Sequence, residues 1–221
     1  MSSRGARSPA FVAAPDDHVF GDPEAPVTVL EYGDYECPYC AAAAPVLREL
    51  VEESGGQVRL VFRNFPISDA HPYALTAALA AEAAGAQGAF WPMHERLFSR
   101  QDRLDDAALH AYAEELGLDG DRVVGEAAQP FADKVEADFA AALAAGVGGT
   151  PTLFIDGDRY SGRLELGALR RATAAAGSGV DGRCDPGPRW QRRWPLVRRR
   201  AQGEAPAEDT EQDDPDDRCG H

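Results

Sequence analysis

The amino-acid sequence predicts an α/β fold, in which a small mixed β-sheet carries helices on both faces and a helical region is inserted. Three observations predict it. Two β-rich segments near the start enclose a helical one, a long stretch of helical pattern follows, and the chain then returns to two short strands and a helix. A β-α-β opening implies a parallel strand pair joined by a crossover helix, whereas a short hairpin implies an antiparallel pair.

The opening β-α-β unit begins with residues 27–32, which are rich in β-branched and aromatic side chains and predict a strand. Residues 38–54 predict a helix with an apolar side, and Pro45 inside it should kink that helix. Residues 58–62 predict the second strand, and Pro66 ends the segment.

The inserted region has a helical pattern from about residue 72 to residue 146. We expect Gly85, Gly117 and Pro130 to divide it into about four helices, because glycine and proline interrupt helices. The acidic residues of this region are expected on solvated helix faces. They are Glu114, Glu115, Asp133, Glu136 and Asp138.

The last part of the fold returns to strands. Residues 152–155 predict a third strand, and Asp156-Gly157 is a strong hairpin signal that leads into Arg159 and Tyr160. Residues 164–176 predict a closing helix, with Gly177 placed to cap its end.

Charge and hydropathy exclude several classes of protein. The 221 residues hold 37 acidic and 22 basic side chains, which gives a formal charge of −15. Nucleic-acid binding needs a basic surface, and so does docking on anionic lipid. No apolar run approaches the roughly 18 residues of a membrane helix. We therefore expect neither a nucleic-acid nor a membrane partner.

The chain divides into three parts by composition. We expect a flexible N-terminus at residues 1–16, a folded domain at 17–176 with its helical insertion at about 67–146, and a disordered charged tail at 177–221. An alternative for the arginine- and tryptophan-containing part of the tail is a docking peptide for a nucleic acid or an acidic protein. The first residues lack the apolar run of a signal peptide. This predicts a cytoplasmic protein, or an extracytoplasmic one if the start codon is mis-assigned.

The sharpest feature of the sequence is Cys37-Pro38-Tyr39-Cys40, which lies between a predicted strand and a predicted helix. Cysteines three apart on a helix lie on one face, near the ~5.5 Å Cα separation that a disulfide prefers. Proline favours the first helical position, so Cys37 should be the N-cap, where the helix dipole stabilises a thiolate. Cys40 lies one turn inward and should keep a higher pKa. We therefore expect Cys37 to attack and Cys40 to resolve the mixed disulfide.

Two other interpretations of these cysteines remain open. Zinc would need Cys184 together with Cys219 or His221 as its further ligands. A purely structural disulfide would close a very small loop and stabilise little. We expect a redox-active pair with no metal and no bound cofactor, because the cysteines themselves carry the electrons.

Two motifs resemble those of a known family. The run Asp34-Tyr35-Glu36-Cys37-Pro38-Tyr39-Cys40 is similar to the active-site stretch of the DsbA-like thioredoxin-fold disulfide oxidoreductases, and so is Gly148-Gly149-Thr150-Pro151-Thr152. The helical block resembles the inserted subdomain of that family, and the resemblance covers about residues 17–176. It implies a thioredoxin-like fold and thiol–disulfide exchange with protein or peptide substrates and a redox partner.

The resemblance also implies roles for single residues. Pro151 matches the family's cis-proline, which lies across from the dithiol, and the backbone edge at Thr150 would pair with an extended substrate segment. Glu31 matches a buried acid beneath the active site. Burial should raise its pKa, so that it can relay the proton of Cys40. The alternative is that Glu31 points to solvent.

The dipeptide between the cysteines tunes their chemistry. Pro38 and Tyr39 are neutral, so the helix dipole acts without an added cation, and we expect the pKa of Cys37 between about 7 and about 3.5. The function predicted is a dithiol–disulfide oxidoreductase whose direction depends on its partners' potentials. The alternative function is a redox-sensing module that binds a partner with little turnover. Of the histidines, we expect His71 at a helix boundary and His94 in the core of the insertion.

Overall fold

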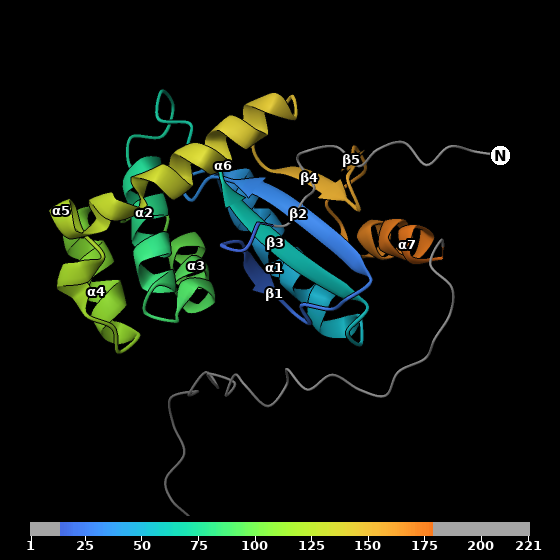
Figure 1. The fold of residues 1–221 in the computed structure, drawn as a ribbon, viewed down its shortest axis with the longest axis horizontal. Helices are drawn as coiled ribbons and strands as arrows, with labels where there is room; N and C mark the ends of the chain where they lie inside the picture. The colour runs from blue at the N-terminus through green and yellow to red at the C-terminus, as the bar shows by residue number, and fades with distance from the viewer. Residues whose placement is uncertain (1–13, 179–221) are drawn as a thin grey trace, which may run out of the picture.

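The computed structural model describes residues 14–178 and contains a five-stranded mixed sheet (Figure 1). Its strands are β1 (His18–Phe20), β2 (Val27–Gly33), β3 (Val58–Asn64), β4 (Thr152–Ile155) and β5 (Asp158–Tyr160). Their order is β1-β3-β2-β4-β5. The pair β2–β3 is parallel and the other three pairs are antiparallel, which confirms the predicted mixed sheet.

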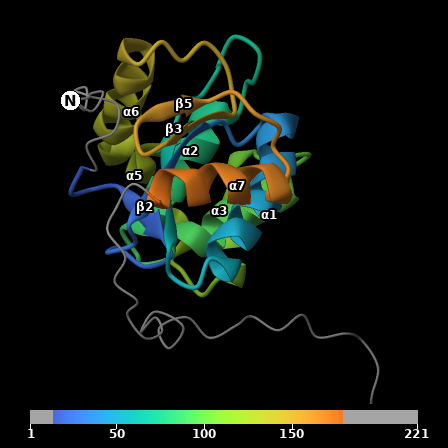
Figure 2. The ribbon, with the colours of Figure 1, turned by 90° about the vertical axis from the view of Figure 1, so that its right-hand side faces the viewer.

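Helices cover both faces of the sheet. Side chains alternate between the two faces along a strand. Val27 and Val29 of β2 pack against α1 (Pro38–Glu53) and α7 (Leu166–Gly177). Leu30 and Tyr32 point the other way, into a cluster with α6 (Ala132–Ala144). Because both faces are covered, every residue of β2 is buried. Figure 2 shows α7 lying beside α1.

The segment between β3 and β4 is helical, and its first helices lie at one end of the sheet (Figure 1). Besides α6 it contains α2 (Ala74–Gly85), α3 (Phe90–Ser99), α4 (Asp106–Glu115) and α5 (Gly125–Ala128). Short 3₁₀ turns at Gly120–Arg122 and Gln129–Phe131 separate the last of them. Helix α2 is apolar around most of its circumference and is largely buried, as expected of a helix at the centre of such a cluster.

Several elements differ in extent from the sequence prediction. Strand β1 was not predicted, because its three residues show no period and it forms only by pairing with β3. Strands β2 and β3 continue to Gly33 and Asn64. Helix α1, with Pro45 inside it, ends at Glu53. Helix α7 begins at Leu166 and includes Gly177, so its C-cap is Ser178.

The predicted flexible N-terminus at residues 1–16 and the predicted disordered tail at 177–221 lie mostly outside the described residues. The structure describes residues 14–16 of the first, and of the second it describes Gly177 and Ser178, which belong to the end of α7 and its cap.

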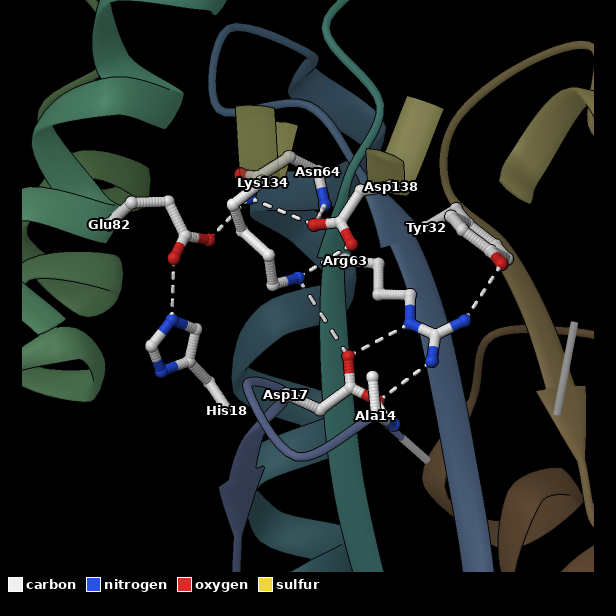
Figure 3. A network of polar contacts seen from close by, with 9 residues as sticks. All are labelled: Ala14, Asp17, His18, Tyr32, Arg63, Asn64, Glu82, Lys134 and Asp138. Carbon is white, nitrogen blue, oxygen red and sulfur yellow. Dashed lines mark hydrogen bonds and ion pairs between the residues drawn. The ribbon is translucent and has the colours of Figure 1, made fainter. Parts of the chain in front are cut away.

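Charged and polar side chains around Arg63 and Asn64, at the end of β3, form what we call the polar network (Figure 3). It comprises Asp17, His18, Arg63, Asn64, Glu82, Lys134 and Asp138. The Asp17 carboxylate accepts hydrogen bonds from Nε and Nη2 of Arg63 at 2.9 and 2.7 Å. Lys134 donates to Asp138 at 2.6 Å and lies 3.8 Å from Asp17. The network thus joins the N-terminal segment, β3 and α6.

Two further bonds extend the polar network to α2. The Asn64 side-chain amide donates to Glu82 at 2.6 Å, and Glu82 also bonds Nε2 of His18 at 2.7 Å. The expectation that Asp138 lies on a solvated face is wrong: it is 4% exposed and accepts a hydrogen bond from the Asn64 backbone N–H. Sequence spacing could not show that the face of α6 bearing Asp138 packs on β3.

Candidate active site

The two cysteines lie at the start of α1, immediately after the end of β2. Cys37 is the N-cap, with extended backbone angles (φ −75°, ψ 121°), and Pro38 occupies the first helical position, as the sequence predicts. The pKa of the Cys37 thiol is lowered to about 5. The largest cause is a hydrogen bond with Cys40; the Thr150 side chain and the backbone N–H groups of Cys40 and Tyr39 add to it, and burial opposes it. This value lies inside the expected range.

Cys40 has the opposite character. It is fully buried, and both its hydrogen bond with Cys37 and burial raise its pKa. Both cysteines are free thiols in this structure. Cys37 is itself only 4% exposed, whereas Tyr39, two residues on in the first turn of α1, is 72% exposed. At neutral pH the pair therefore combines one thiolate near the surface with one protonated thiol behind it.

Thr150 and Pro151 lie directly across from Cys37. The Cys37 thiol donates to the Thr150 carbonyl oxygen at 3.4 Å, and the peptide bond between Thr150 and Pro151 is cis. Strand β4 pairs with β5 only from Leu153 onward, so the Thr150–Pro151 segment lies beyond the end of that ladder. Its backbone therefore lies next to the reactive sulfur and outside the β4–β5 pairing.

Glu31 lies on β2 beneath the dithiol. Its side chain is fully buried, and neither carboxylate oxygen has a hydrogen-bond partner among the described residues. Burial, with a smaller contribution from the charge of Cys37, raises its pKa to about 8. The alternative in which Glu31 points to solvent is therefore wrong. A carboxyl group of this kind exchanges its proton near neutral pH.

Asp34 organises the turn between β2 and α1. It is buried, and its carboxylate accepts hydrogen bonds from the Glu36 and Ile67 backbone N–H groups, both at 2.8 Å. It also bonds Nδ1 of His71 at 2.8 Å, and this bond raises the pKa of His71. From the sequence we predicted only a helix boundary at His71, and not its bond to Asp34. The available signal was the position of Asp34 before the cysteines, where aspartate often accepts a bond from the backbone N–H two residues on.

Gln101 was also missed by the sequence analysis. It lies in the turn between α3 and α4, and its side-chain nitrogen donates to the carbonyl oxygens of Tyr35 and Cys37 at 2.8 and 2.9 Å. His94 of α3 is buried, as expected, and its ring contacts Tyr35. No local pattern could reveal Gln101, because it reaches the dithiol from a distant part of the chain.

Metal-binding clusters and membrane-spanning helices were both predicted to be absent. Within residues 14–178, no group of three or more His, Cys, Asp or Glu side chains is arranged to hold a metal ion. The further zinc ligands considered above, Cys184, Cys219 and His221, lie outside this range. No helix within it is long and apolar enough to cross a bilayer.

Comparison with curated proteins finds relatives that are much longer than this chain. The chain is 48% identical over 165 residues to a Na⁺/H⁺ antiporter NhaA 1 of Salinispora arenicola, a match that covers 74% of this chain and 25% of that protein. An antiporter NhaA 1 of Mycolicibacterium gilvum is 40% identical over 162 residues, with 72% and 26% covered. The chain spans about a quarter of the length of the curated relatives it matches.

Several solved structures have a similar fold. A thioredoxin-like oxidoreductase from Silicibacter pomeroyi is 29% identical with a TM-score of 0.67, covering 80% of this chain and all of that one. BdbD from Bacillus subtilis is 23% identical with a TM-score of 0.62, covering 74% and 94%. Wolbachia pipientis α-DsbA1 is 21% identical with a TM-score of 0.67, covering 79% and 97%.

A protein-family model described as thioredoxin matches residues 13–174, a range that includes every strand and every helix of the described fold except the last turn of α7. The resemblance drawn from the two sequence motifs and the predicted thioredoxin-like fold are both confirmed. The chain belongs to the thioredoxin family, and its structural neighbours are DsbA-like thiol–disulfide oxidoreductases.

Proposed function

We propose that this chain exchanges disulfides with protein or peptide substrates through Cys37-Pro38-Tyr39-Cys40. The observation that carries the proposal is the contrast between the two sulfurs. Cys37 has a pKa lowered to about 5 and is the N-cap of α1, whereas Cys40 lies one turn inward and is fully buried with a raised pKa. A thiolate is the attacking species in exchange. Cys40 remains protonated, and therefore unreactive, until the mixed disulfide has formed.

The exchange runs in two steps. In the reducing direction, the Cys37 thiolate attacks a substrate disulfide, forms a mixed disulfide and releases one substrate thiolate. Cys40 then loses its proton to the Glu31 carboxylate and attacks Cys37. The Cys37–Cys40 disulfide forms, the second substrate thiolate leaves, and two electrons have passed to the substrate. The oxidising direction is the reverse, with Glu31 returning the proton to Cys40.

Substrate binding uses the edge opposite the dithiol. The Thr150–Pro151 backbone lies beyond the β4–β5 ladder and next to the Cys37 sulfur, so an extended peptide segment can add to it as a strand. Tyr39 and Tyr73 are exposed aromatic side chains, and the Tyr73 backbone N–H donates to the carboxylate of Glu36, the residue before Cys37, at 2.7 Å. They favour an apolar polypeptide over a small thiol.

The test is insulin-disulfide reduction, with Cys37→Ser and Cys40→Ser compared at matched pH. Cys37→Ser should abolish reduction, because no thiolate remains to attack. Cys40→Ser should accumulate a mixed disulfide with insulin, visible by mass spectrometry. If the unmodified protein neither reduces insulin nor oxidises a dithiol peptide, the proposal fails. The reduction potential against glutathione then assigns the direction and tests the proposed cytoplasmic location.

A second candidate function is a redox-sensing module that binds a partner and turns over little. One observation favours it: the curated relatives of this sequence are Na⁺/H⁺ antiporters of which it covers about a quarter. On this candidate the redox state of Cys37 and Cys40 sets the affinity for a transport protein of that type. Binding of the oxidised and reduced protein to a purified antiporter separates the two candidates. The sensing function is supported if the affinity for the antiporter depends on the redox state of the cysteines while the reduction and oxidation assays are both negative.

A further inference from the structure

One side chain of the helical insertion, Gln101, hydrogen-bonds the backbone of the segment that carries the reactive cysteine. Gln101 donates to the carbonyl oxygens of Tyr35 and Cys37, so the two protons of one amide nitrogen bridge the active-site turn. The turn between α3 and α4 that presents Gln101 is itself fixed. The Arg103 N–H donates to the Arg100 carbonyl at 3.0 Å, and the Tyr112 hydroxyl donates to the Arg103 carbonyl at 2.9 Å.

These bonds fix the peptide groups on both sides of Cys37. The Cys37 N–H donates to the Asp34 carbonyl at 3.1 Å, which holds the preceding peptide. Gln101 holds the following peptide through the Cys37 carbonyl, which also accepts the Ala41 N–H at 3.2 Å. With both neighbours held, the backbone of Cys37 keeps its N-cap angles at the start of α1, where the backbone N–H groups of Tyr39 and Cys40 help to lower the pKa of its thiol.

We propose that Gln101 is a positioning residue for the Cys37 thiolate and that it couples the helical insertion to the chemistry of the dithiol. It touches neither the sulfur nor a substrate. It acts by holding the Cys37 carbonyl, so that the thiolate keeps the hydrogen bonds that stabilise it. The helical insertion thereby adjusts how oxidising the pair is, in addition to forming part of the core. This inference deepens the proposed exchange function and rests on it.

The experiment uses the full chain with Cys184→Ser and Cys219→Ser, so that only the two active-site sulfurs absorb as thiolates. Gln101→Met keeps the length of the side chain and removes both donors. In the Cys40→Ser background, thiolate absorbance against pH should show the Cys37 pKa raised by about half a unit to one unit, the shift expected for one typical hydrogen bond. With Cys40 present, the equilibrium constant for reduction of the disulfide by glutathione should fall about three- to tenfold.

The matched control is Gln87→Met. Gln87 also bridges two turns of the insertion, accepting from the Asp119 N–H at 3.0 Å, but it does not touch the active-site turn. It should leave both readouts unchanged. Gln101→Glu, which keeps the size and places an acceptor against the two carbonyls, should raise the Cys37 pKa more than Gln101→Met, and it decides the matter if the methionine variant does not fold.

The proposal is overturned if Gln101→Met or Gln101→Glu lowers the midpoint of thermal unfolding but leaves the Cys37 pKa and the glutathione equilibrium unchanged, because that is the effect of a purely structural residue. An equal shift in Gln87→Met also overturns it. Neither readout requires a protein substrate. A chain that fails to reduce insulin, and so fails the proposed function, therefore still reports on Gln101.

Discussion

Glu31 and Asp17 both carry carboxylates that are at most 1% exposed, but their surroundings differ. Asp17 belongs to the polar network, where it accepts hydrogen bonds from the Arg63 guanidinium and from the Ala14 N–H. Glu31 lies beneath the dithiol with no hydrogen-bond partner for either oxygen among the described residues. The charge of Asp17 is therefore compensated by hydrogen bonds and an ion pair, whereas Glu31 has no such partner and takes up a proton.

The comparison shows how a buried carboxylate group contributes to stability in one place and to proton transfer in another. A buried charge that is paired is costly to disturb, because removing one partner leaves the other uncompensated. A buried carboxyl that is unpaired instead becomes neutral by raising its pKa. The carboxylates of the polar network are held by cations and N–H groups, and among its fully buried side-chain nitrogen and oxygen atoms in residues 14–178 the Asn64 amide oxygen is the one without a hydrogen-bond partner.

The largest expected effect is on the pH dependence of stability and comes from Glu31. Its pKa is 4.5 when unfolded and about 8 when folded, so between these values the folded state keeps a proton that the unfolded state releases. The contribution of Glu31 to the free energy of unfolding is therefore complete below pH 4.5 and is lost as the pH rises to about 8. The loss over the whole range is about 5 kcal/mol. Urea unfolding at several pH values measures this loss.

The variant that isolates this effect is Glu31→Gln in the Cys37→Ser background, which removes the opposing titration of Cys37. It should flatten the fall in stability between pH 4.5 and 8. Glu49→Gln, which changes an exposed glutamate of α1, should keep the fall. If Glu31→Gln and its parent lose stability equally with pH, Glu31 does not keep its proton in the fold and the contrast with Asp17 disappears.

Asp17→Ala should break the polar network. It removes the Asp17 carboxylate from the Arg63 guanidinium, which is 7% exposed, and we expect a loss of about 3–5 kcal/mol in the free energy of unfolding because this buried ion pair is broken. The Cys37 pKa and the insulin-reduction rate of the folded protein should not change. Chemical denaturation measures the first quantity and the exchange assays the second. Asp16→Ala, at the exposed neighbouring position, is the control; a similar loss there would remove the network from the explanation.

The smallest expected effect concerns His71, whose pKa is raised by its bond to Asp34. The stability from this pair, about 1 kcal/mol or less, is complete below the unfolded pKa of 6.5 and is lost as the pH rises through the higher folded value. NMR titration of the ring should give a midpoint above 6.5. Asp34→Asn should move that midpoint down, with the His110 ring signals as an internal reference; an unmoved midpoint would show that Asp34 is not the cause.

Most of the fold could be predicted from local pattern. Strand β4 was placed at the residues where the structure has it, α1 at Pro38, and the Asp156-Gly157 turn leads into β5. These elements have either a clear hydrophobic period or a turn residue with one dominant conformation. Strand β1 had neither, and its three residues become a strand only because the edge of β3 is available to pair with them.

The candidate site was predictable where its residues are neighbours in sequence and hidden where they are not. Cys37, Pro38 and Cys40 form one motif, so the N-cap and the buried position of Cys40 follow from helix geometry. Glu31 and Thr150 were proposed from family resemblance, and the structure brings both near the dithiol. Gln101 and the bond between Asp34 and His71 join positions far apart in the chain, and no sequence period encodes such a contact.

The sequence by itself determined the chemistry available to this protein: two cysteines one helical turn apart at a helix start, in an acidic chain with an α/β pattern. Tertiary structure alone decided how reactive each group is. A pKa depends on burial and on which donors and charges surround a group, and those are set by packing. Packing left Glu31 unpaired, compensated Asp17, and placed Gln101 against the Cys37 carbonyl.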